Sequence, residues 1–147
     1  MDFTVSEKMR TIVGMIDEFV DKELIPLEPV FLRGDMTTLE KEIRDKQRLV
    51  KQMELWAPNH PVEYGGMGLD LMEHALVSEA LGRTPLGHYV FGCQAPDSGN
   101  AEILAHFGTP EQKEKYLQPL LDGKIASCYS MTEPQAGADP AEIECVA

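Results

Sequence analysis

The chain has 147 residues, 43% of them hydrophobic and 26% charged, which fits one folded domain and excludes a largely disordered chain. Its net charge of −12 leaves little material for a basic face, so nucleic acid and anionic membrane surfaces are disfavoured partners. The three cysteines have no CxxC spacing, and the sequence carries neither a secretory signal nor a membrane-spanning run, which favours a bacterial cytoplasm or an organelle matrix over secretion.

The first predicted helix has apolar residues at three- and four-residue spacing on one face. That face consists of Met9, Ile12, Val13, Ile16, Phe19, Val20 and Leu24. Thr4 and Glu7 fit a capping box at its start, and Pro26 and Pro29 are expected to end it. We interpret the apolar stripe as core packing.

A second helix is expected from Thr37 or Thr38 to Trp56, with Glu40 as its capping-box partner. Its apolar face consists of Leu39, Ile43, Val50 and Met53. The glycine-rich residues 59–69 follow, without the lysine and the preceding strand that a phosphate-binding P-loop needs. A structural turn is therefore favoured there over a phosphate-binding loop.

A third helix is predicted to begin near Asp70, with Glu73 completing a capping box and Gly82 just past its end. Its apolar side consists of Met72, Ala75, Leu76, Ala80 and Leu81. Residues 84–96 then contain no Asp, Glu, Lys or Arg. In so acidic a chain this predicts a buried segment, either a central core helix or the lining of an apolar pocket.

Two more helices are predicted before residue 124. Asp97 or Ser98 can cap a short helix that carries Ile103, Leu104 and Phe107. The segment Thr109 to Gln112 has a cap, a proline and a capping-box glutamine, which is typical of a helix start. The face of that helix consists of Tyr116, Leu117, Leu120 and Leu121, and Pro119 is expected to kink or shorten it.

The hydrophobic period changes after Lys124. Residues 125–132 alternate as a strand does, 133–140 have the Pro and Gly content of a loop, and 141–147 resemble the start of a second strand. Two strands alone are marginally stable. The element order therefore predicts a helical domain, 1–124, followed by the opening of another domain, 125–147.

No catalytic motif stands out, since GxSxG, HExxH and CxxC are all absent, and the four scattered histidines do not predict a metal site. The best candidate from chemistry alone is the segment 128–139, with hydroxyls at Ser130 and Thr132 before a Pro- and Gly-containing turn. Polar groups at a strand end can hydrogen-bond a planar heterocycle or an anion.

Three segments resemble the acyl-CoA dehydrogenase family, and they occur in the family's order. PVEYGGMGLD, at 61–70, is similar to the family's turn before a helix. FGTPEQKEKYLQPLLDGK, at 107–124, is similar to the helix that leads into the flavin-binding signature, and YSMTEPQAGADP, at 129–140, resembles that signature. The resemblance covers essentially the whole chain.

The resemblance implies a mainly α fold. The family has an N-terminal helical domain, a middle β-domain and a C-terminal helical bundle. This chain would be the N-terminal helical domain of five to six helices, followed by one or two strands of a truncated β-domain. The family's catalytic glutamate belongs to the C-terminal bundle, so no residue of this chain is expected to be catalytic.

The resemblance also implies FAD as cofactor and an acyl-CoA thioester as substrate, which loses hydrogen from its α and β carbons. Tyr129, Ser130, Met131 and Thr132 would contact the flavin ring. Gly137 and Ala138 would lie near the flavin and the thioester, and Ala138 stands where many members have serine. Tyr89 and Asn100, with the uncharged stretch 84–96, would wall the acyl pocket.

The implied partners are the acyl-CoA substrate, an electron-transfer flavoprotein as electron acceptor and further copies of the full-length protein. The chain alone is expected to be inactive, because it lacks the glutamate. The alternative is a non-catalytic short isoform, or a helical module that binds an acyl group or a partner protein.

Overall fold

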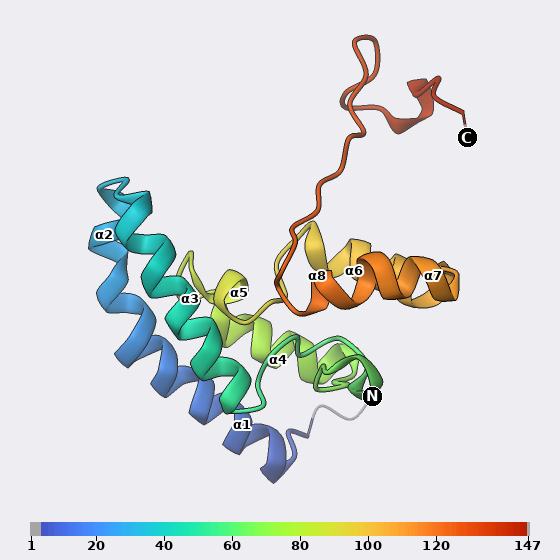
Figure 1. The fold of residues 1–147 in the computed structure, drawn as a ribbon. Coiled ribbons are helices and arrows are strands. Elements are labelled where there is room, and N and C mark those ends of the chain that lie inside the picture. Colours follow the sequence, from blue (N-terminus) through green and yellow to red (C-terminus); the bar gives the residue numbers. More distant parts are fainter. Residues whose placement is uncertain (1–3, 147) are drawn as a thin grey trace.

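The computed structural model describes residues 4–146 and shows a chain built from helices (Figure 1). The mainly α class is thus confirmed. The α-helices are α1 (Glu7–Phe19), α2 (Glu28–Leu32), α3 (Met36–Gln52), α4 (Leu71–Leu81), α5 (Gly87–Val90), α6 (Asp97–Phe107), α7 (Pro110–Gln112) and α8 (Gln118–Leu121). Short 3₁₀ turns lie at Ile25–Leu27, Val62–Tyr64 and Pro140–Glu142, and π-helical turns at Val20–Leu24 and Lys113–Leu117. None of the described helices is long and apolar enough to cross a membrane.

The start of α1 is capped by Ser6, whose hydroxyl oxygen accepts a hydrogen bond from the Met9 backbone N–H at 3.2 Å. The predicted capping pair of Thr4 and Glu7 is therefore wrong by two residues. The predicted apolar face is confirmed: Met9, Ile16, Phe19, Val20 and Leu24 are buried, and Ile12 and Val13 pack against them.

Prolines shape two helices without ending them. Pro26 and Pro29 were expected to stop the first helix, but the chain stays helical through the π turn, a 3₁₀ turn and α2. Each π turn ends two residues before a proline, Pro26 in one case and Pro119 in the other. A widened turn accommodates the missing N–H and the bulk of the proline ring. Pro119 was expected to kink or shorten its helix, but it lies in the first turn of α8 and the helical course continues to Leu121.

The helix α3 is capped by Asp35, whose carboxylate accepts from the Thr38 backbone N–H, so the predicted start at Thr37 or Thr38 with Glu40 as capping-box partner is wrong. The helix ends at Gln52, before the predicted end at Trp56. The glycine-rich residues 59–69 form a structural turn, as expected. Gly65 and Gly68 have φ of 85° and 64°, a region that glycine adopts without steric cost.

The start of α4 is the predicted capping box. The Asp70 carboxylate accepts from the Glu73 N–H at 2.8 Å, and the Glu73 carboxylate accepts from the Asp70 N–H at 3.2 Å. Its predicted face is only half right, because Val77 is fully buried whereas Met72 is exposed. The α6 face is only partly right: Leu104 is partly buried, but Ile103 and Phe107 are exposed, and Ala101 is the buried residue.

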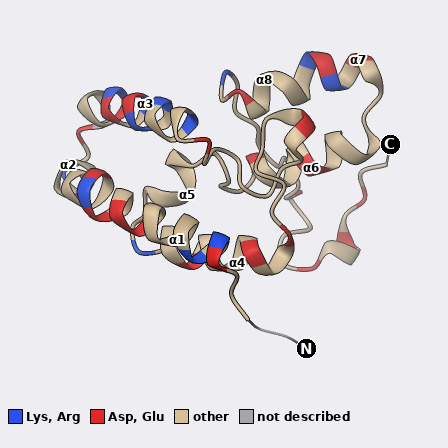
Figure 2. Cartoon of the chain, turned by 90° about the horizontal axis from the view of Figure 1, so that it is seen from below, with Lys and Arg blue, Asp and Glu red and all other residues tan. Residues whose placement is uncertain are grey.

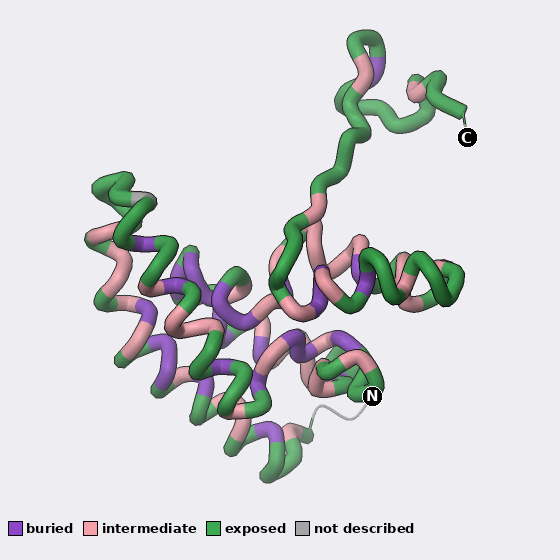
Figure 3. Tube along the Cα trace, viewed as in Figure 1, coloured by how far each residue is buried: buried purple, intermediate pink, exposed green. Residues whose placement is uncertain are grey.

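The buried residues form two clusters. The larger joins α1, α3, α4 and α5, and the smaller joins α6 to the π turn Lys113–Leu117 and to α8 (Figure 3). Phe19 of α1 meets Phe91, just after α5, edge to face with ring centroids 5.5 Å apart. These packed helices form a rigid base from which the C-terminal segment departs.

The one or two strands expected after residue 124 are not formed, since no segment within residues 4–146 is a strand. Residues 125–132 run extended, away from the helical body (Figure 1). A strand needs a neighbour for its backbone groups, and alternating side chains predict the extended conformation but not the pairing. The second expected strand is replaced at its start by the 3₁₀ turn Pro140–Glu142, and Ala147 lies outside the described residues. The division of the chain at residue 124 stays a prediction.

Acidic side chains occur on most of the helices, and basic side chains gather along α3 (Figure 2). Several of the basic groups on α3 have acidic partners: Arg44 pairs with Glu40, Arg48 with Asp45 and Lys46 with Glu23. These pairs reduce the positive charge that α3 presents.

Candidate functional site

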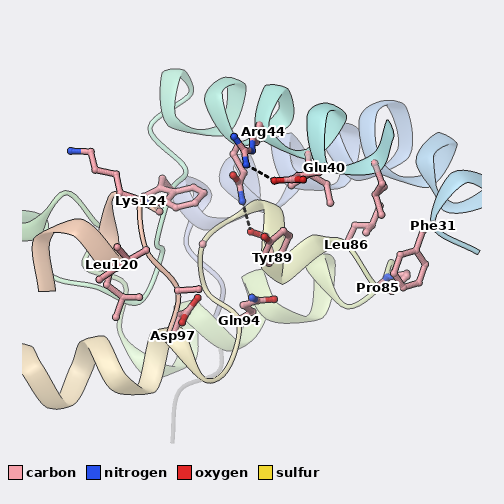
Figure 4. A pocket seen from close by; sticks show the side chains of 18 residues that line it. Phe31, Glu40, Arg44, Pro85, Leu86, Tyr89, Gln94, Asp97, Leu120 and Lys124 are labelled. Carbon is pink, nitrogen blue, oxygen red and sulfur yellow. Dashed lines mark hydrogen bonds and ion pairs between the residues drawn. The ribbon is translucent and has the colours of Figure 1, made fainter. Parts of the chain in front are cut away.

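A cavity of about 700 Å³ lies between α3, α5 and the chain that follows α8 (Figure 4). The uncharged stretch 84–96 forms one of its walls. That stretch contributes Pro85, Leu86, Tyr89, Gly92 and Gln94. The opposite walls come from α2, α3 and residues 120–126, including Phe31, Leu39, Ile43, Trp56, Leu120, Ile125 and Ala126. Of the two interpretations left open for this stretch, pocket lining and core packing both apply to it.

Specific contacts hold the walls of the cavity together. The Gln47 side-chain amide on α3 donates to the Tyr89 carbonyl on α5 at 3.2 Å (Figure 4). Val90 and Phe91, in the same stretch, belong to the buried core. The side chain of Tyr89 stays 43% exposed and borders the cavity.

Trp56 joins the two sides of the cavity. Its indole N–H donates to the Leu121 carbonyl at 2.7 Å, and the Lys51 ammonium lies 4.2 Å from the ring centroid. Lys51 also donates to the Asp122 carbonyl at 2.6 Å, and its partial burial lowers its pKa. Gly92 lets the ring approach, because a Cβ there would lie 2.5 Å from the indole Cζ2.

The cavity combines an apolar floor with a polar rim. Leu39, Ile43 and Leu86 are buried side chains of the floor. Arg44 and Glu40, an ion pair, and Lys124 stand among the lining residues and are labelled in Figure 4. Such a site suits a ligand with an apolar body and a polar end.

The residues expected to contact a flavin lie on the extended segment, outside the cavity. Tyr129 and Met131 are 58% and 53% exposed, and Ser130 and Thr132 are also exposed. Within the described residues, the backbone groups of 128–132 make no hydrogen bonds. The segment therefore presents free backbone donors, free acceptors and the Thr132 hydroxyl, the kinds of group that bind the polar edge of a planar ring.

Ser127 ties this segment to the helical body. One Asp97 carboxylate oxygen accepts from the Ser127 backbone N–H at 2.7 Å and from its hydroxyl at 2.6 Å. The Asn100 side-chain amide donates to the Ser127 hydroxyl oxygen at 2.8 Å. Asp97 or Ser98 was predicted to cap α6, but Pro96 takes the cap position and the Asp97 carboxylate binds Ser127.

The turn after the extended segment is closed by Glu133. Its backbone N–H donates to the Ala136 carbonyl at 2.9 Å, and the Ala136 N–H donates back at 3.2 Å. Its carboxylate accepts from the backbone N–H groups of Glu144 and Cys145 at 3.0 and 2.9 Å, which lowers the pKa of Glu133. Gly137 and Ala138 lie exposed beside this turn.

The structure thus separates the expected site residues into two groups. Tyr89 borders the cavity, whereas Asn100 lies at the start of α6 and binds Ser127. The six residues expected to bind the cofactor belong to the exposed segment. Sequence reasoning missed Asp97 and Ser127, and only their contact across thirty positions of sequence reveals them.

The part of the chain that the structure describes holds no group of three or more His, Cys, Asp or Glu that could bind a metal. Burial raises the pKa of Cys93 to about 12, so its thiol stays protonated and unreactive.

Ser78 and His88 share a hydrogen bond of 2.7 Å between α4 and α5.

Comparisons with known proteins agree on one family. Residues 6–124 match the family model described as "Acyl-CoA dehydrogenase, N-terminal domain". The chain is 48% identical to acyl-CoA dehydrogenase family member 11 of Homo sapiens over 97% of its length and 34% identical to (R)-benzylsuccinyl-CoA dehydrogenase of Thauera aromatica over 95%. A solved structure from Mycobacterium abscessus, assigned to the acyl-CoA dehydrogenases, superposes on 94% of the chain with a TM-score of 0.84 and 33% identity.

The chain spans a minor part of each of these proteins. It covers 19% of the human relative, 36% of the Thauera aromatica relative and 37% of the Mycobacterium abscessus structure.

Proposed function

The chain belongs to the acyl-CoA dehydrogenase family, whose N-terminal domain it matches over residues 6–124, and on that basis we propose that it is part of a flavin-dependent acyl-CoA dehydrogenase. The proposed enzyme removes hydrogen from the α and β carbons of an acyl-CoA thioester. In it, this chain walls the acyl chain and presents a flavin-binding segment.

The cavity is the proposed seat of the acyl chain. Its wall of Pro85, Leu86 and Tyr89 carries no charge, and its floor is apolar. Burying an alkyl chain against such a surface yields about 0.8 kcal/mol per CH₂ group. The apolar side chains among the lining residues suit the alkyl part of an acyl group. The polar rim near Arg44 and Lys124 then faces the more polar end of the ligand.

The extended segment is the proposed contact with FAD, and its exposed, unpaired backbone fits that role. When bound, FAD supplies a ring that accepts a hydride from the substrate β-carbon. We propose that the Thr132 hydroxyl and the backbone of Tyr129, Ser130 and Met131 hydrogen-bond such a ring. Gly137 and Ala138 flank the thioester end, where the methyl of Ala138 offers no hydroxyl.

The base that removes the α-proton is not assigned to any residue of this chain. The acidic side chains of the described helices include caps and ion-pair partners, as Asp70 and Glu40 illustrate. We propose that the base comes from other domains of the protein. Those domains also complete the flavin site and the contacts between copies. Further proposals are an electron-transfer flavoprotein as acceptor and a bacterial cytoplasm or organelle matrix as location.

One observation carries the proposal. The helical domain of the family model ends at residue 124, and the signature segment leaves that body directly beside the cavity. The cavity and the signature are therefore adjacent, as a dehydrogenase that moves a hydride from substrate to flavin requires.

The test uses the native gene product that contains this sequence. We expect acyl-CoA-dependent reduction of a dye acceptor, together with a visible flavin spectrum. Thr132→Ala is expected to weaken flavin retention, because it removes one hydroxyl from the flavin contact, and Thr132→Ser is the matched control that keeps the hydroxyl. Unchanged FAD occupancy in Thr132→Ala counts against the role given to Thr132.

A native protein that holds no flavin and reduces no dye in the presence of acyl-CoA contradicts the proposal. In that case, binding of an acyl group or of a partner protein by a non-catalytic helical module is the function to test next.

A further inference from the structure

The contact between α6 and the extended segment is built from three side chains, which we name the Ser127 clamp: Asp97, Asn100 and Ser127. One carboxylate oxygen of Asp97 receives two hydrogen bonds, at 2.7 and 2.6 Å, and Asn100 adds a third at 2.8 Å. All three residues are half-buried. Hydrogen bonds to an ionised group are roughly twice as strong as neutral ones.

The clamp lies between the two parts of the proposed site. Ile125 and Ala126, just before Ser127, line the cavity, as Asp97 itself does. Tyr129 to Thr132, just after it, form the proposed flavin contact. Ser127 is half-buried, whereas both of its neighbours are exposed. The clamp therefore stands at the point where the cavity ends and the flavin-facing segment begins.

Within the described residues, the clamp supplies every hydrogen bond that links residues 126–132 to the helical body. Before the segment, the N–H groups of Lys124 and Ile125 donate to the Pro119 carbonyl at 2.9 and 3.4 Å, and beyond it the hydrogen bonds of Glu133 stay within the C-terminal segment. The Tyr129 hydroxyl lies beside the same turn of α6, 3.5 Å from the position where a Cβ on Gly99 would stand, which is an ordinary contact distance. The direction of the segment thus depends on the first turn of α6.

The charge of Asp97 suits this place. Asp97 is the first residue of an eleven-residue helix, where the unpaired N–H groups and the helix dipole favour a negative charge. A carboxylate at this position is a strong acceptor for the two Ser127 donors.

We propose that Asp97 is a positioning residue, which fixes Ser127 so that the flavin-facing segment leaves the end of the acyl cavity in one direction. This inference rests on the proposed function, because it assigns the acyl chain to the cavity and FAD to the segment. Hydride transfer requires the two reacting atoms in near-attack geometry, and a displacement of about 1 Å costs on the order of 100-fold in rate.

The test compares variants of the native gene product. Asp97→Ala is expected to lower kcat per bound flavin by about tenfold to 100-fold, with a smaller change in KM for acyl-CoA, and to alter the visible flavin spectrum. Asp97→Asn keeps an acceptor oxygen for Ser127 and should recover part of the loss. Asp70→Ala is the matched control, because it removes a helix-start carboxylate far from the segment and should leave kcat per bound flavin unchanged.

Ser127→Ala removes the two hydrogen bonds of the hydroxyl and keeps the bond from the backbone N–H to Asp97. It keeps the proposal falsifiable if Asp97→Ala fails to fold, and we expect a smaller loss of kcat per bound flavin, so that unchanged kcat and an unchanged flavin spectrum would overturn the proposal. In Asp97→Ala, hydrogen exchange of the Ser127 amide should accelerate by about tenfold, as expected for one lost charge-assisted hydrogen bond. Unchanged exchange in Asp97→Ala overturns the proposal, and so does faster exchange with kcat per flavin and the flavin spectrum both unchanged.

The failure of the proposed function has a different signature. If the unaltered native protein holds no flavin, the proposed function is contradicted while the clamp is still decided by exchange in the 147-residue chain. A Ser127 amide that is protected in the unaltered chain and loses protection in Asp97→Ala supports the positioning of the segment. Equal exchange in the two chains overturns it.

Discussion

Single residues show where close packing leaves no alternative to glycine. Gly92 has φ of 68°, and its missing side chain leaves the space that the Trp56 ring occupies at the cavity wall. Gly34 has a similar φ of 70° but nothing within 4 Å of the position where a Cβ would lie. A substitution at Gly34 would therefore introduce backbone strain alone, whereas a substitution at Gly92 would add a steric clash.

We expect Gly34→Ala to lower the free energy of unfolding by about 1–2 kcal/mol, the cost of a left-handed alanine. Gly92→Ala should lower the free energy of unfolding by at least twice as much, because it adds a clash with the indole to the same backbone strain. Urea denaturation of both variants measures the difference. Equal losses would show that the Trp56 ring moves aside without cost.

His60 makes the stability of the domain sensitive to acid. Its side chain is 2% exposed, and its Nε2 has no hydrogen-bond partner among the described residues. Burial lowers the pKa of His60 below 6.5, nearby His74 lowers it further, and Glu102 opposes the change. Burial also lowers the pKa of His74. The folded state therefore takes up these protons less readily than the unfolded state does.

A depressed histidine pKa stabilises the fold fully above the unfolded value of 6.5. As pH falls below that value, the unfolded chain binds protons that the folded chain does not bind. We therefore expect the free energy of unfolding to fall by up to about 1.4 kcal/mol per pH unit for each such histidine. His60→Gln should flatten the dependence of the urea midpoint between about pH 7 and pH 5, and His106→Gln, at an exposed position, should not. An unchanged slope in His60→Gln would refute this explanation.

At the scale of elements, the sequence predicts the helix starts at Asp70 and Thr109 correctly, whereas Ser6 and Asp35 cap helices for which other residues were predicted. The capping boxes at Asp70 and Thr109 are both present. The signal is local, since one side chain binds a backbone group three residues away. Asp97 shows the limit of that signal, because a better partner, Ser127, reaches it from elsewhere in the chain.

Helix ends and strands could not be predicted with the same success. Pro26 did not end the helical course, because the widened π turn before it accommodates the proline ring. Residues 125–132 have the alternation of a strand, but pairing depends on a neighbour that residues 4–146 do not provide. Val77 was missed because the buried side of α4 is set by the contact between α1 and α4 rather than by the helix's own pattern.

The capping box of α4 allows a direct test. Asp70→Ala removes the acceptor for the Glu73 N–H, and we expect it to lower the free energy of unfolding by about 1 kcal/mol. Asp70→Asn retains an acceptor and should lose much less. Thermal or urea unfolding provides the comparison, and equal losses in the two variants would contradict the capping role.

At the scale of the whole molecule, cavity and signature segment lie on one body but do not complete a site. Tyr89 borders the cavity, whereas Thr132 lies on a segment whose backbone has no partners among the described residues. The family, the helical architecture and the uncharged wall were all accessible from the sequence. The cavity's far walls, from α3 and residues 120–126, required the tertiary structure.

We therefore expect the 147-residue chain by itself to show no acyl-CoA-dependent dye reduction. It should bind FAD weakly or not at all, because its extended segment has no sheet to hold it. Dye-reduction assays and gel filtration with FAD measure both properties. Turnover above background, or a yellow protein that survives gel filtration, would contradict this expectation.

Native mass spectrometry of the gene product that contains this sequence is the most direct test of the proposed function. It reports the mass of the polypeptide and any bound FAD in one measurement. We predict a subunit much heavier than the 16.4 kDa of this chain, carrying one FAD. A 16.4 kDa subunit without FAD would contradict the proposal that this chain works as part of a flavin-dependent dehydrogenase.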